Sequence, residues 1–553
     1  MKLPSTICGA ALLAAAATHA AKNGLPVDKV YGVNIGSWLL SEPWMFPNEW
    51  QSMGGEVCND CSQCAASEFA LTKKLGQEQA DKVFAQHWST WFTQEHVNMI
   101  ADAGLNTVRI PLGFWIVEGL VDRSNEYYPK GGMAYLKKGL KMLKAKGIHV
   151  LLDFHALPGV SSANQMFAGQ CTPNVNFYND ENYDRALIWA AVMTAMCHID
   201  PDFSSVFGIE AINEPEMDYN KTPGLGDYER KFVKVIRIVE LALGITCPDA
   251  DYTKLLSNAT FDFTSILSGG ILALSRKIDE DLQQILTQVS TLVTSICQDL
   301  GLPSMHWKRA LEGLSSQDAA MRKNYGTPRL SSIDDLKQTL PESSGGTIPS
   351  VAGAVAGIAG EKRVPHGYSL ERHLDEKRSH HKRGLYIPLL GANRKCLSTS
   401  FMNKDWQYNN PPNPADVAIG PQVYDAHLYF SFGGVADPNA QSYMQVICNT
   451  DRVSRATAEN NRPMFFGEWS LATNFQVEGN FLSDWADAQK LIYAGQADGW
   501  IFWNFRVEKG SVYSPAWSYL DSLAAGYFTK DPSQLNNPDV CKPWMANTTT
   551  TTS

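Results

Sequence analysis

Short apolar runs alternate along this chain with longer stretches whose apolar residues recur at helical spacing. Eight runs have the length and composition of strands, namely 30–40, 107–110, 149–154, 206–216, 396–400, 423–429, 464–468 and 500–505. Helical patterns cover 78–103, 133–146, 184–198, 228–243 and 485–498. Because strands and helices mostly alternate, we expect an α/β fold with a parallel sheet, and eight such strands predict a closed (β/α)8 barrel, the TIM barrel.

Polar and aromatic residues follow the ends of most predicted strands, and in such a barrel these ends meet on one face. The run 206–216 is mainly apolar and then delivers Asn213, Glu214 and Pro215, and the proline stops the hydrogen-bonded ladder. Desolvation at the end of an apolar strand raises the pKa of a carboxyl, which suits Glu214 to donate a proton near neutral pH. The other strand ends carry Glu42, Arg109, His155, His427, Tyr429, Glu468 and Trp503.

Each of these residues also has a purely structural explanation when taken alone. Arg109 would suit an ion pair, His155 and His427 would suit hydrogen-bonded core positions, and Trp503 would suit packing. Glu214 could cap a helix or form a salt bridge. At successive strand ends of one barrel, however, the set together is hard to explain as packing.

The alternation is interrupted by a large insertion between the fourth helix and the fifth strand. Its first half has helical periodicity over 261–300, and its second half is rich in Gly, Ser and Ala before a basic stretch that runs up to Gly384. We therefore expect a signal peptide at 1–20, a first barrel half with strands 1–4 at 21–246 and a partly helical insertion at 247–393. A second half with strands 5–8 at 394–546 and a tail at 547–553 complete the chain. The insertion should emerge on the face opposite the strand ends.

The N-terminus and the cysteines predict export. Residues 1–20 begin with Lys2, continue through an Ala- and Leu-rich run and close on small residues, as a secretory signal does, and we find no second apolar stretch long enough to span a membrane. We expect the protein outside the cell or in the cell wall. Of 11 cysteines, all but Cys8 lie beyond the signal, and this even number predicts disulfides. The spacing of Cys58, Cys61 and Cys64 would also suit zinc, although no histidine lies near. The sequons at Asn258 and Asn547 predict N-glycans.

Composition excludes some classes of protein. The net charge of -10 disfavours nucleic acid as a partner, because phosphates require a basic surface. A hydrophobic content of 44% and a mean hydropathy of -0.22 exclude a wholly disordered chain. No metal or nucleotide motif is visible, so we expect no metal and no cofactor, and we expect a monomer.

Two glutamates at strand ends, with cationic and aromatic neighbours, suggest a retaining glycosidase. In such enzymes one carboxyl protonates the leaving oxygen and the other attacks the anomeric carbon. Arg109 and Tyr429 should hold Glu468 ionised, so that Glu468 loses its proton at lower pH than Glu214.

An ordered set of motifs runs from residue 32 to residue 519. The motifs are GVNIGSWLLSEPWM, GLNTVRIPLGFW, LLDFHALPG, GIEAINEPE, YDAHLYF, FFGEWS, GWIFWNFRVE and SPAWSY. This set resembles glycoside hydrolase family 5, and within it the fungal exo-β-1,3-glucanases. The resemblance implies that Glu214 is the acid/base and Glu468 the nucleophile of a secreted enzyme acting on β-1,3-glucan polysaccharide or oligosaccharide. It also implies sugar contacts by Glu42, Arg109, His155, Asn213, His427, Tyr429 and Trp503. Phe432 and Phe167 would form an aromatic entrance that grips glucose units.

Three departures from the family pattern leave the linkage open. They are the large insertion, Ser41 ahead of Glu42, and a loop around 161–167 that is longer than usual. A β-1,6-glucanase of the same family is the next alternative, and a barrel that binds wall glucan without cleaving it is a third. Exo or endo action is not decided at this stage.

Overall fold

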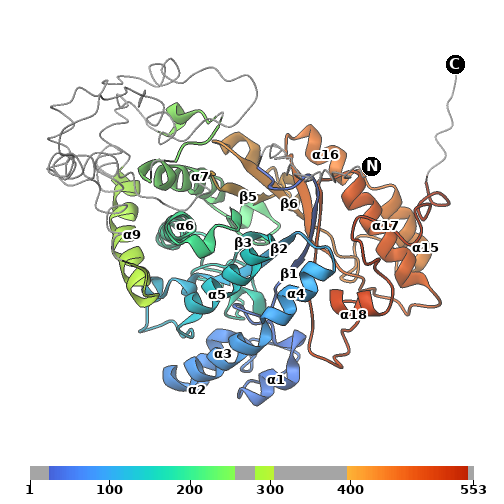
Figure 1. The fold of residues 1–553 in the computed structure, drawn as a ribbon, viewed down its shortest axis with the longest axis horizontal. Coiled ribbons are helices and arrows are strands. Elements are labelled where there is room, and N and C mark those ends of the chain that lie inside the picture. The colour runs from blue at the N-terminus through green and yellow to red at the C-terminus, as the bar shows by residue number, and fades with distance from the viewer. Residues whose placement is uncertain (1–23, 244, 249, 256–279, 304–394, 546–553) are drawn as a thin grey trace, which may run out of the picture.

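The computed structural model describes residues 24–243, 245–248, 250–255, 280–303 and 395–545. Within them, eight parallel strands close a barrel in chain order, with β8 paired to β1 (Figure 1). The strands are β1 (Val30–Asn34), β2 (Thr107–Gly113), β3 (His149–Ala156), β4 (Val206–Glu210), β5 (Ser398–Met402), β6 (Gln422–His427), β7 (Met464–Glu468) and β8 (Gly499–Phe502). The predicted TIM barrel is confirmed. The predicted signal peptide, both glycosylation sequons and the low-complexity part of the insertion lie outside the described residues.

Helices follow most of the strands and cover the outside of the barrel. They include α3 (Gln77–Trp91), α4 (Gln94–Asp102), α5 (Gly132–Ala145), α6 (Asp180–Ile199), α7 (Leu225–Ala242), α15 (Ala440–Cys448), α16 (Arg452–Ala458) and α17 (Phe481–Gly495). Shorter helices precede and follow them, namely α1 (Pro47–Ser52), α2 (Glu68–Leu75) and α18 (Tyr519–Ala524). The 3-10 helices η8 (Lys404–Trp406) and η9 (Pro414–Val417) occupy the connection from β5 to β6.

The helix predicted over 78–103 is two helices, α3 and α4. Phe92 is extended, and Thr93 starts α4 with a capping box in which the Thr93 backbone N–H donates to His96 Nδ1 at 3.1 Å. The apolar periodicity passes through this break because Phe92 is also buried in the core. The apolar periodicity reflects which residues are buried, and burial continues through this position although the helical hydrogen bonds are interrupted.

Four strands end earlier than their apolar runs predicted. β1 stops at Asn34, β4 at Glu210, β6 at His427 and β8 at Phe502. The residues after β1 leave the sheet but stay buried, as Ile35, Trp38 and Leu39 do. An apolar run therefore does not by itself separate a strand from a buried loop at the barrel mouth.

The barrel interior changes from apolar to charged along its axis. Because alternate residues of a strand point inward, Leu151 and Asp153 share one face of β3, and Val423 and Asp425 share one face of β6. The apolar members pack as a separate cluster with strand residues of β1, β7 and β8, which are Val30, Phe465 and Ile501, and with Leu25. This cluster fills the N-terminal end, so the polar side chains gather at the C-terminal end, where the strand ends meet.

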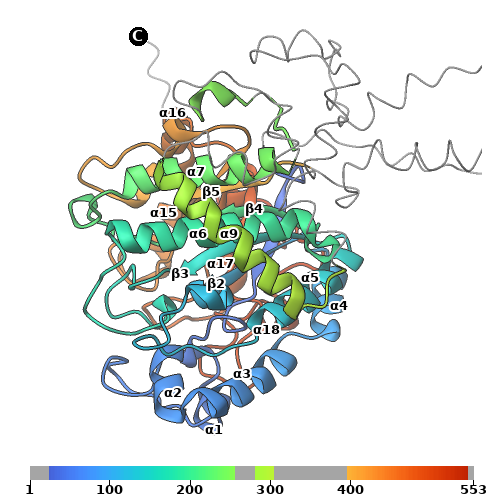
Figure 2. The ribbon, with the colours of Figure 1, turned by 90° about the vertical axis from the view of Figure 1, so that its left-hand side faces the viewer.

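One helix of the predicted insertion is described. α9 (Glu280–Asp299) lies across α6 on the outside of the barrel (Figure 2). Its buried residues recur at helical spacing, and they are Leu282, Ile285, Val289, Val293 and Cys297. The helical periodicity predicted for this stretch is confirmed over these residues.

Four disulfides cross-link the described residues. They join Cys58 to Cys64, Cys61 to Cys171, Cys247 to Cys396 and Cys448 to Cys541. The zinc alternative for the first three cysteines is wrong, because all three sulfurs are bound to other sulfurs. The other two cysteines among the described residues, Cys197 and Cys297, are buried and free.

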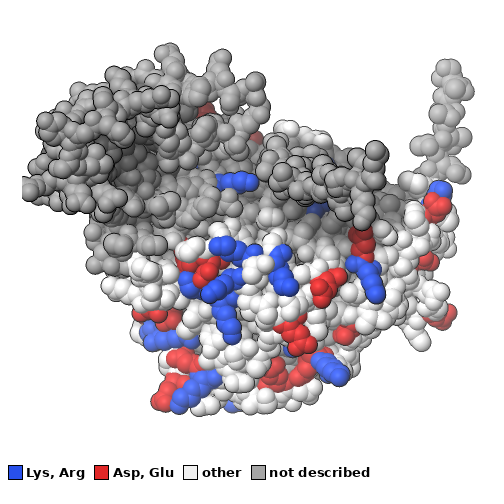
Figure 3. Space-filling view, viewed as in Figure 1, with Lys and Arg blue, Asp and Glu red and all other residues white. Residues whose placement is uncertain are grey.

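On the face seen in Figure 3, basic and acidic side chains are interspersed, and no large patch of one sign is visible. None of the helices in the described ranges has the length and apolar character that a membrane crossing requires.

Candidate active site

Arg109 organises the polar end of the barrel interior. It lies on β2, fully buried, and its guanidinium donates to Glu468 Oε1, Glu210 Oε2 and Asn213 Oδ1, each at 2.8 Å. A carboxylate oxygen of Asp153 lies 3.0 Å from the same guanidinium. A buried cation is tolerated when several anionic and hydrogen-bonding partners surround it, and these partners come from β3, β4, the segment after β4, and β7.

Glu214 and Glu468 both face the same ring nitrogen of His427. The Nδ1 atom of His427 is 2.8 Å from Glu214 Oε1 and 3.5 Å from Glu468 Oε2. One carboxylate oxygen of each glutamate lies within 4.8 Å of the other. Carboxyls about 5 to 5.5 Å apart are typical of retaining glycosidases, whereas about 6.5 to 9.5 Å is needed to admit the water of an inverting enzyme.

The backbone turns at Glu214 to bring its side chain over the barrel mouth. Glu214 has a φ of 39°, in the left-handed region that residues with a Cβ adopt at a cost. Ser162 Oγ, from the loop after β3, donates to the Glu214 carbonyl at 2.8 Å and holds this turn. The longer loop around 161–167 is therefore part of the support of the site.

The environment of Glu468 differs from the sequence-based expectation. Burial raises the pKa of Glu468 above the ordinary value, His427 and Arg109 lower it, and Glu214 raises it further. The net direction of this pKa is upward, whereas the sequence led us to expect that Arg109 and Tyr429 would hold Glu468 ionised. The sequence suggested which cationic residues lie near Glu468, but it could not show how far complete burial offsets their effect on the pKa of Glu468.

His427 is the cation between the two glutamates. Burial lowers the pKa of His427, but Glu468 and Asp425 raise it by more, and the net pKa lies well above that of an ordinary histidine. The imidazolium can therefore hold both carboxyl groups in place. Tyr429 adds a hydrogen bond, because its hydroxyl donates to Glu468 Oε2 at 2.9 Å.

The residues expected to bind sugar surround this pair. His155 Nδ1 lies 2.5 Å from Asp153 Oδ2, and the His155 ring stacks against Trp503 with centroids 5.7 Å apart. Glu42 accepts a hydrogen bond from Trp44 Nε1 at 3.0 Å. Burial raises the pKa of Glu42 to about 7, although His155 lowers it. Near neutral pH this carboxyl can thus donate or accept a hydrogen bond.

The two phenylalanines expected at the entrance each contact one residue of this set. Phe167 packs edge-on against His155 with ring centroids 5.4 Å apart. Phe432 lies 5.6 Å from Tyr429 and is 77% exposed. A single exposed ring is common on protein surfaces, so the role of Phe432 at a sugar-binding entrance stays a prediction.

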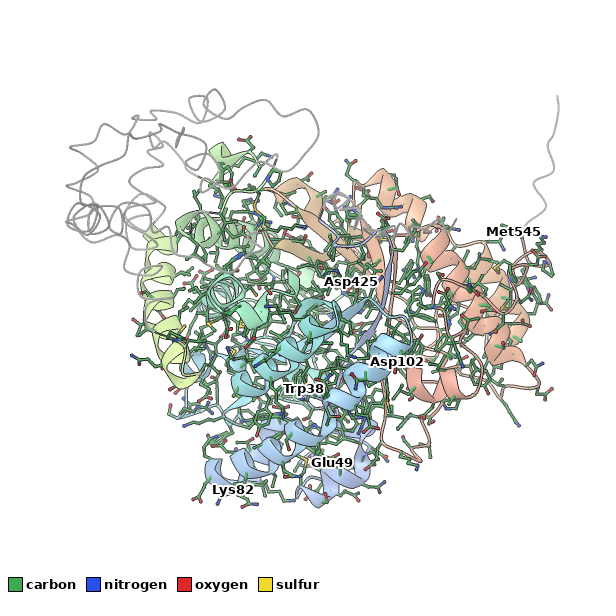
Figure 4. All side chains as sticks on the ribbon, in the orientation of Figure 1. Trp38, Glu49, Lys82, Asp102, Asp425 and Met545 are labelled. Atoms are coloured by element: carbon green, nitrogen blue, oxygen red, sulfur yellow. A yellow bond between two sulfur atoms is a disulfide. The ribbon has the colours of Figure 1, made fainter. Side chains whose placement is uncertain are left out.

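Sequence reasoning missed the carboxyls beneath the site. Asp153, Glu210 and Asp425 are fully buried around Arg109, and Asp425 lies among the barrel strands in Figure 4. Asp153 and Asp425 each precede a site histidine by two residues, and that spacing places both side chains on one face of a strand. This signal could have found two of the three.

Two aromatic residues were also missed. Trp406 packs edge-on against His427 at 5.8 Å, and its Nε1 donates to the Pro215 carbonyl at 2.7 Å. Trp517 lies 5.4 Å from Tyr429 and 5.3 Å from Trp44. Both follow strands by several residues, in loops whose course the sequence does not determine.

Three groups of described side chains come close enough to share a metal ion. Glu214, His427 and Glu468 form one, and Glu210, Asp425 and His427 form another. Arg109 already contacts Glu210, Asp425 and Glu468 and supplies a positive charge to both groups. The third group contains Cys247 and Cys396, whose sulfurs are joined to each other.

The barrel and the paired carboxyl groups at its strand ends have a geometry that is typical of barrel glycoside hydrolases. Residues 73–266 match the model of one family in this class, Cellulase (glycosyl hydrolase family 5). This matched stretch is less than half of the chain, and it belongs to the family that the sequence motifs resemble.

Curated relatives of this chain are fungal glucanases. It is 40% identical over 228 residues to Glucan endo-1,6-beta-glucosidase B of Emericella nidulans, a match that covers 41% of this chain and 54% of that protein. It is 32% identical over 231 residues to Probable glucan 1,3-beta-glucosidase A of Aspergillus fumigatus, covering 40% of this chain and 50% of that protein. The matched part thus spans about half the length of these relatives.

Among solved structures, rutinosidase from Aspergillus niger superposes with a TM-score of 0.50 at 15% sequence identity. The superposition covers 92% of this chain and 100% of that one. At this identity the likeness concerns the fold alone.

Proposed function

We propose that this chain is a secreted, retaining β-glucanase that hydrolyses β-1,6-glucan. The observation that carries the reaction type is the pair Glu214 and Glu468, with carboxylate oxygens within 4.8 Å of each other and both facing His427. At this separation one carboxylate can attack carbon directly while the other serves the leaving oxygen.

In the proposed mechanism Glu468 is the nucleophile and Glu214 the acid/base. Glu468 attacks the anomeric carbon while Glu214 protonates the glycosidic oxygen, which leaves with the second part of the glucan. Glu214 then takes a proton from water, and that water releases the sugar from Glu468. Glu468 Oε1 accepts from Arg109 and Oε2 accepts from Tyr429, so both oxygens of the nucleophile are held in a fixed orientation.

The neighbouring polar side chains suit the hydroxyl groups of one glucose unit. Glu42, His155 and Asn213 offer acceptors and donors that converge beside Glu468, and Trp503 offers the face of an aromatic ring. Arg109 fixes Asn213 through its amide oxygen, which leaves the amide NH2 directed to His155 and the sugar side. Preorganised groups of this kind bind without a large cost in ordering.

Our choice of β-1,6-glucan as the substrate rests on the curated relatives. It reverses the preference for β-1,3-glucan that the sequence motifs indicated. The β-1,6-glucanase relative is 40% identical to the chain, against 32% for the 1,3-β-glucosidase over a segment of similar length. β-1,3-Glucan is therefore the second candidate. Export is supported by the four disulfides, which persist in oxidising compartments.

Two measurements test this proposal. Product profiles on pustulan, a β-1,6-glucan, and on laminarin, a β-1,3-glucan, separate the linkages, and we expect faster hydrolysis of pustulan. A faster reaction on laminarin would instead favour the second candidate. For the mechanism, a 2-fluoro glucoside should label Glu468. A label on another residue, or a product with inverted configuration, would refute the assignment.

A further inference from the structure

The charged layer beneath the candidate active site holds more acidic than cationic side chains. Its members are two cations and four acids, namely Arg109, His427, Asp153, Glu210, Asp425 and Glu468. His155 contacts Asp153 and adds at most one further positive charge. Because a buried charge without a partner is costly, at least one of the four carboxyl groups should hold a proton.

Glu210, at the end of β4, has the fewest polar partners of the four. Its side chain is fully buried, and its Oε2 accepts from Arg109 Nε at 2.8 Å. Its Oε1 has no hydrogen-bond partner among the described residues. Each of the other three carboxyls has a second polar partner beside the Arg109 guanidinium, and these partners are His155, the Gly467 backbone N–H and Tyr429. The proton therefore belongs on Glu210.

Asp425 is the acceptor nearest to this proton. Arg109 Nε lies 2.8 Å from Glu210 Oε2 and 3.5 Å from Asp425 Oδ2, and one oxygen of Glu210 lies within 4.8 Å of one oxygen of Asp425. In the described part of the chain, Asp425 Oδ2 likewise has no hydrogen-bond partner. Two buried carboxyl groups this close repel each other when both are ionised, and a proton shared between them removes the repulsion.

The electrostatic surroundings of Glu210 support the same assignment. Burial raises the pKa of Glu210 well above its ordinary value, Arg109 lowers it, and Asp425 and Asp153 raise it further. These three side chains are the charged groups that face Glu210, and they come from β2, β6 and β3. The net direction is upward, so Glu210 keeps its proton at a pH where an exposed glutamate has lost it.

We propose that Glu210 is a positioning residue that stays protonated during turnover and donates a hydrogen bond to Asp425. The inference rests on the proposed function, because it concerns the charge that reaches the nucleophile. A neutral Glu210 leaves more of the positive charge of Arg109 to Glu468, and its hydrogen bond keeps Asp425 ionised beside His427. Glu210 thus acts on the reaction through Arg109 and Asp425.

The first experiment detects the proton by infrared spectroscopy. In the difference spectrum between wild type and Glu210→Gln at neutral pH, we expect loss of a C=O band of a protonated carboxyl, with the carboxylate bands unchanged. Glu68→Gln is the positive control, because Glu68 is also fully buried and burial raises its pKa to about 8. Glu78→Gln, at an exposed position, should instead lose carboxylate bands. Loss of carboxylate bands in Glu210→Gln would overturn the proposal.

The second experiment measures how kcat/KM on glucan depends on pH in Glu210→Gln and Glu210→Leu. Glutamine is neutral and keeps a donor, so kcat/KM should fall by less than about threefold and the acid limb of the profile should stay in place. Leucine is neutral but has neither donor nor acceptor, so kcat/KM should fall by about tenfold or more. Thermal unfolding of both variants separates this loss from a loss of folded protein.

Two outcomes of the second experiment would refute the role of Glu210. If the acid limb moves to lower pH in Glu210→Gln, a negative charge was removed and the pKa of Glu468 fell, so Glu210 was ionised in the wild type. If a folded Glu210→Leu matches the wild type, the hydrogen bond has no effect on the reaction. A wild type that cleaves neither glucan would refute the proposed function, while the infrared spectra would still decide whether Glu210 is protonated.

Discussion

At the scale of single residues, the site depends on a buried cation shared by several carboxyl groups. His427 faces Glu214 and Glu468 through Nδ1, while its Nε2 lies 3.5 Å from Asp425 Oδ2. Arg109 forms ion pairs with Glu468 and Asp425 as well, and also with Glu210. Removing any one of these charges leaves its partners buried and uncompensated. The effects of mutations within this group of charged residues should therefore not be additive.

Glu214→Ala tests the role of the acid. We expect the rate on glucan to fall by about 10² to 10⁴, because the sugar leaving group needs a proton, and to fall much less on an aryl glucoside with a good leaving group. Steady-state rates on both substrates check this. The control is Glu78→Gln, on an exposed face of α3. An equal loss on both substrates would contradict the assignment of Glu214 as the acid.

Asp425→Asn tests what keeps His427 charged. The titratable and charged groups that face His427 are Glu214, Glu468 and Asp425, and the last two raise the pKa of His427 most. Removing one of them lowers that pKa, so the imidazolium is lost at lower pH. If activity needs the imidazolium, the alkaline limb of the profile of kcat/KM against pH should move to lower pH.

Asparagine at position 425 keeps the oxygen that accepts from the Gly467 backbone N–H at 2.6 Å, so packing should be preserved. Unchanged thermal unfolding would confirm this. An alkaline limb that stays in place would show that Asp425 has no influence on His427.

At the scale of elements, α2 begins with a buried carboxyl. Glu68 is fully buried, and one of its oxygens accepts from the Ser41 backbone N–H at 2.8 Å. Burial raises the pKa of Glu68 to about 8, whereas the unfolded chain has an ordinary glutamate pKa. The folded protein therefore binds a proton that the unfolded chain releases as the pH rises from about 4.5 to about 8.

Stability should accordingly fall across this pH window. The contribution of Glu68 to the free energy of unfolding is fully present below the pKa that Glu68 has in the unfolded chain. It is lost as the pH rises, on the order of 1 kcal/mol for each pH unit. Glu68→Gln, a neutral isostere, should flatten the fall in denaturant unfolding measured at several pH values. Glu78→Gln again serves as the exposed control. An unaltered pH dependence in Glu68→Gln would contradict the prediction.

At the scale of the whole molecule, one of the four disulfides among the described residues links the two halves of the barrel. Cys247, which follows α7, is joined to Cys396, which precedes β5, whereas each of the other three disulfides joins residues of one half. The Lys-Arg pairs at 362–363, 377–378 and 382–383 lie between these cysteines, outside the described residues. We expect a dibasic-specific protease to cleave there during export.

A gel can test this processing. The secreted protein should migrate as one species without reductant and as two fragments with reductant, and it should retain activity, because β5–β8 remain packed against β1–β4. A variant in which all three pairs are changed to Ala-Ala should stay as one chain. A wild type that also stays as one chain under reduction would refute the prediction.

The sequence by itself determined the number and order of the strands and the residues at the barrel mouth. Local patterns carry this information, because strands and helices have fixed periods and parallel strands bring their ends to one face. Asn213, Glu214, His427 and Glu468 could be named for that reason. Strand ends could not, since the buried residues after β1 and β8 look like strand.

Only the tertiary structure decided how these groups act on one another. The pKa of Glu468 depends on complete burial weighed against His427 and Arg109, and those three residues come from three different strands. The pairing of the cysteines and the buried carboxyls of Asp153, Glu210 and Asp425 also depend on distances between segments far apart in the chain. Desolvation and contact are properties of the closed barrel, and no local stretch of sequence contains them.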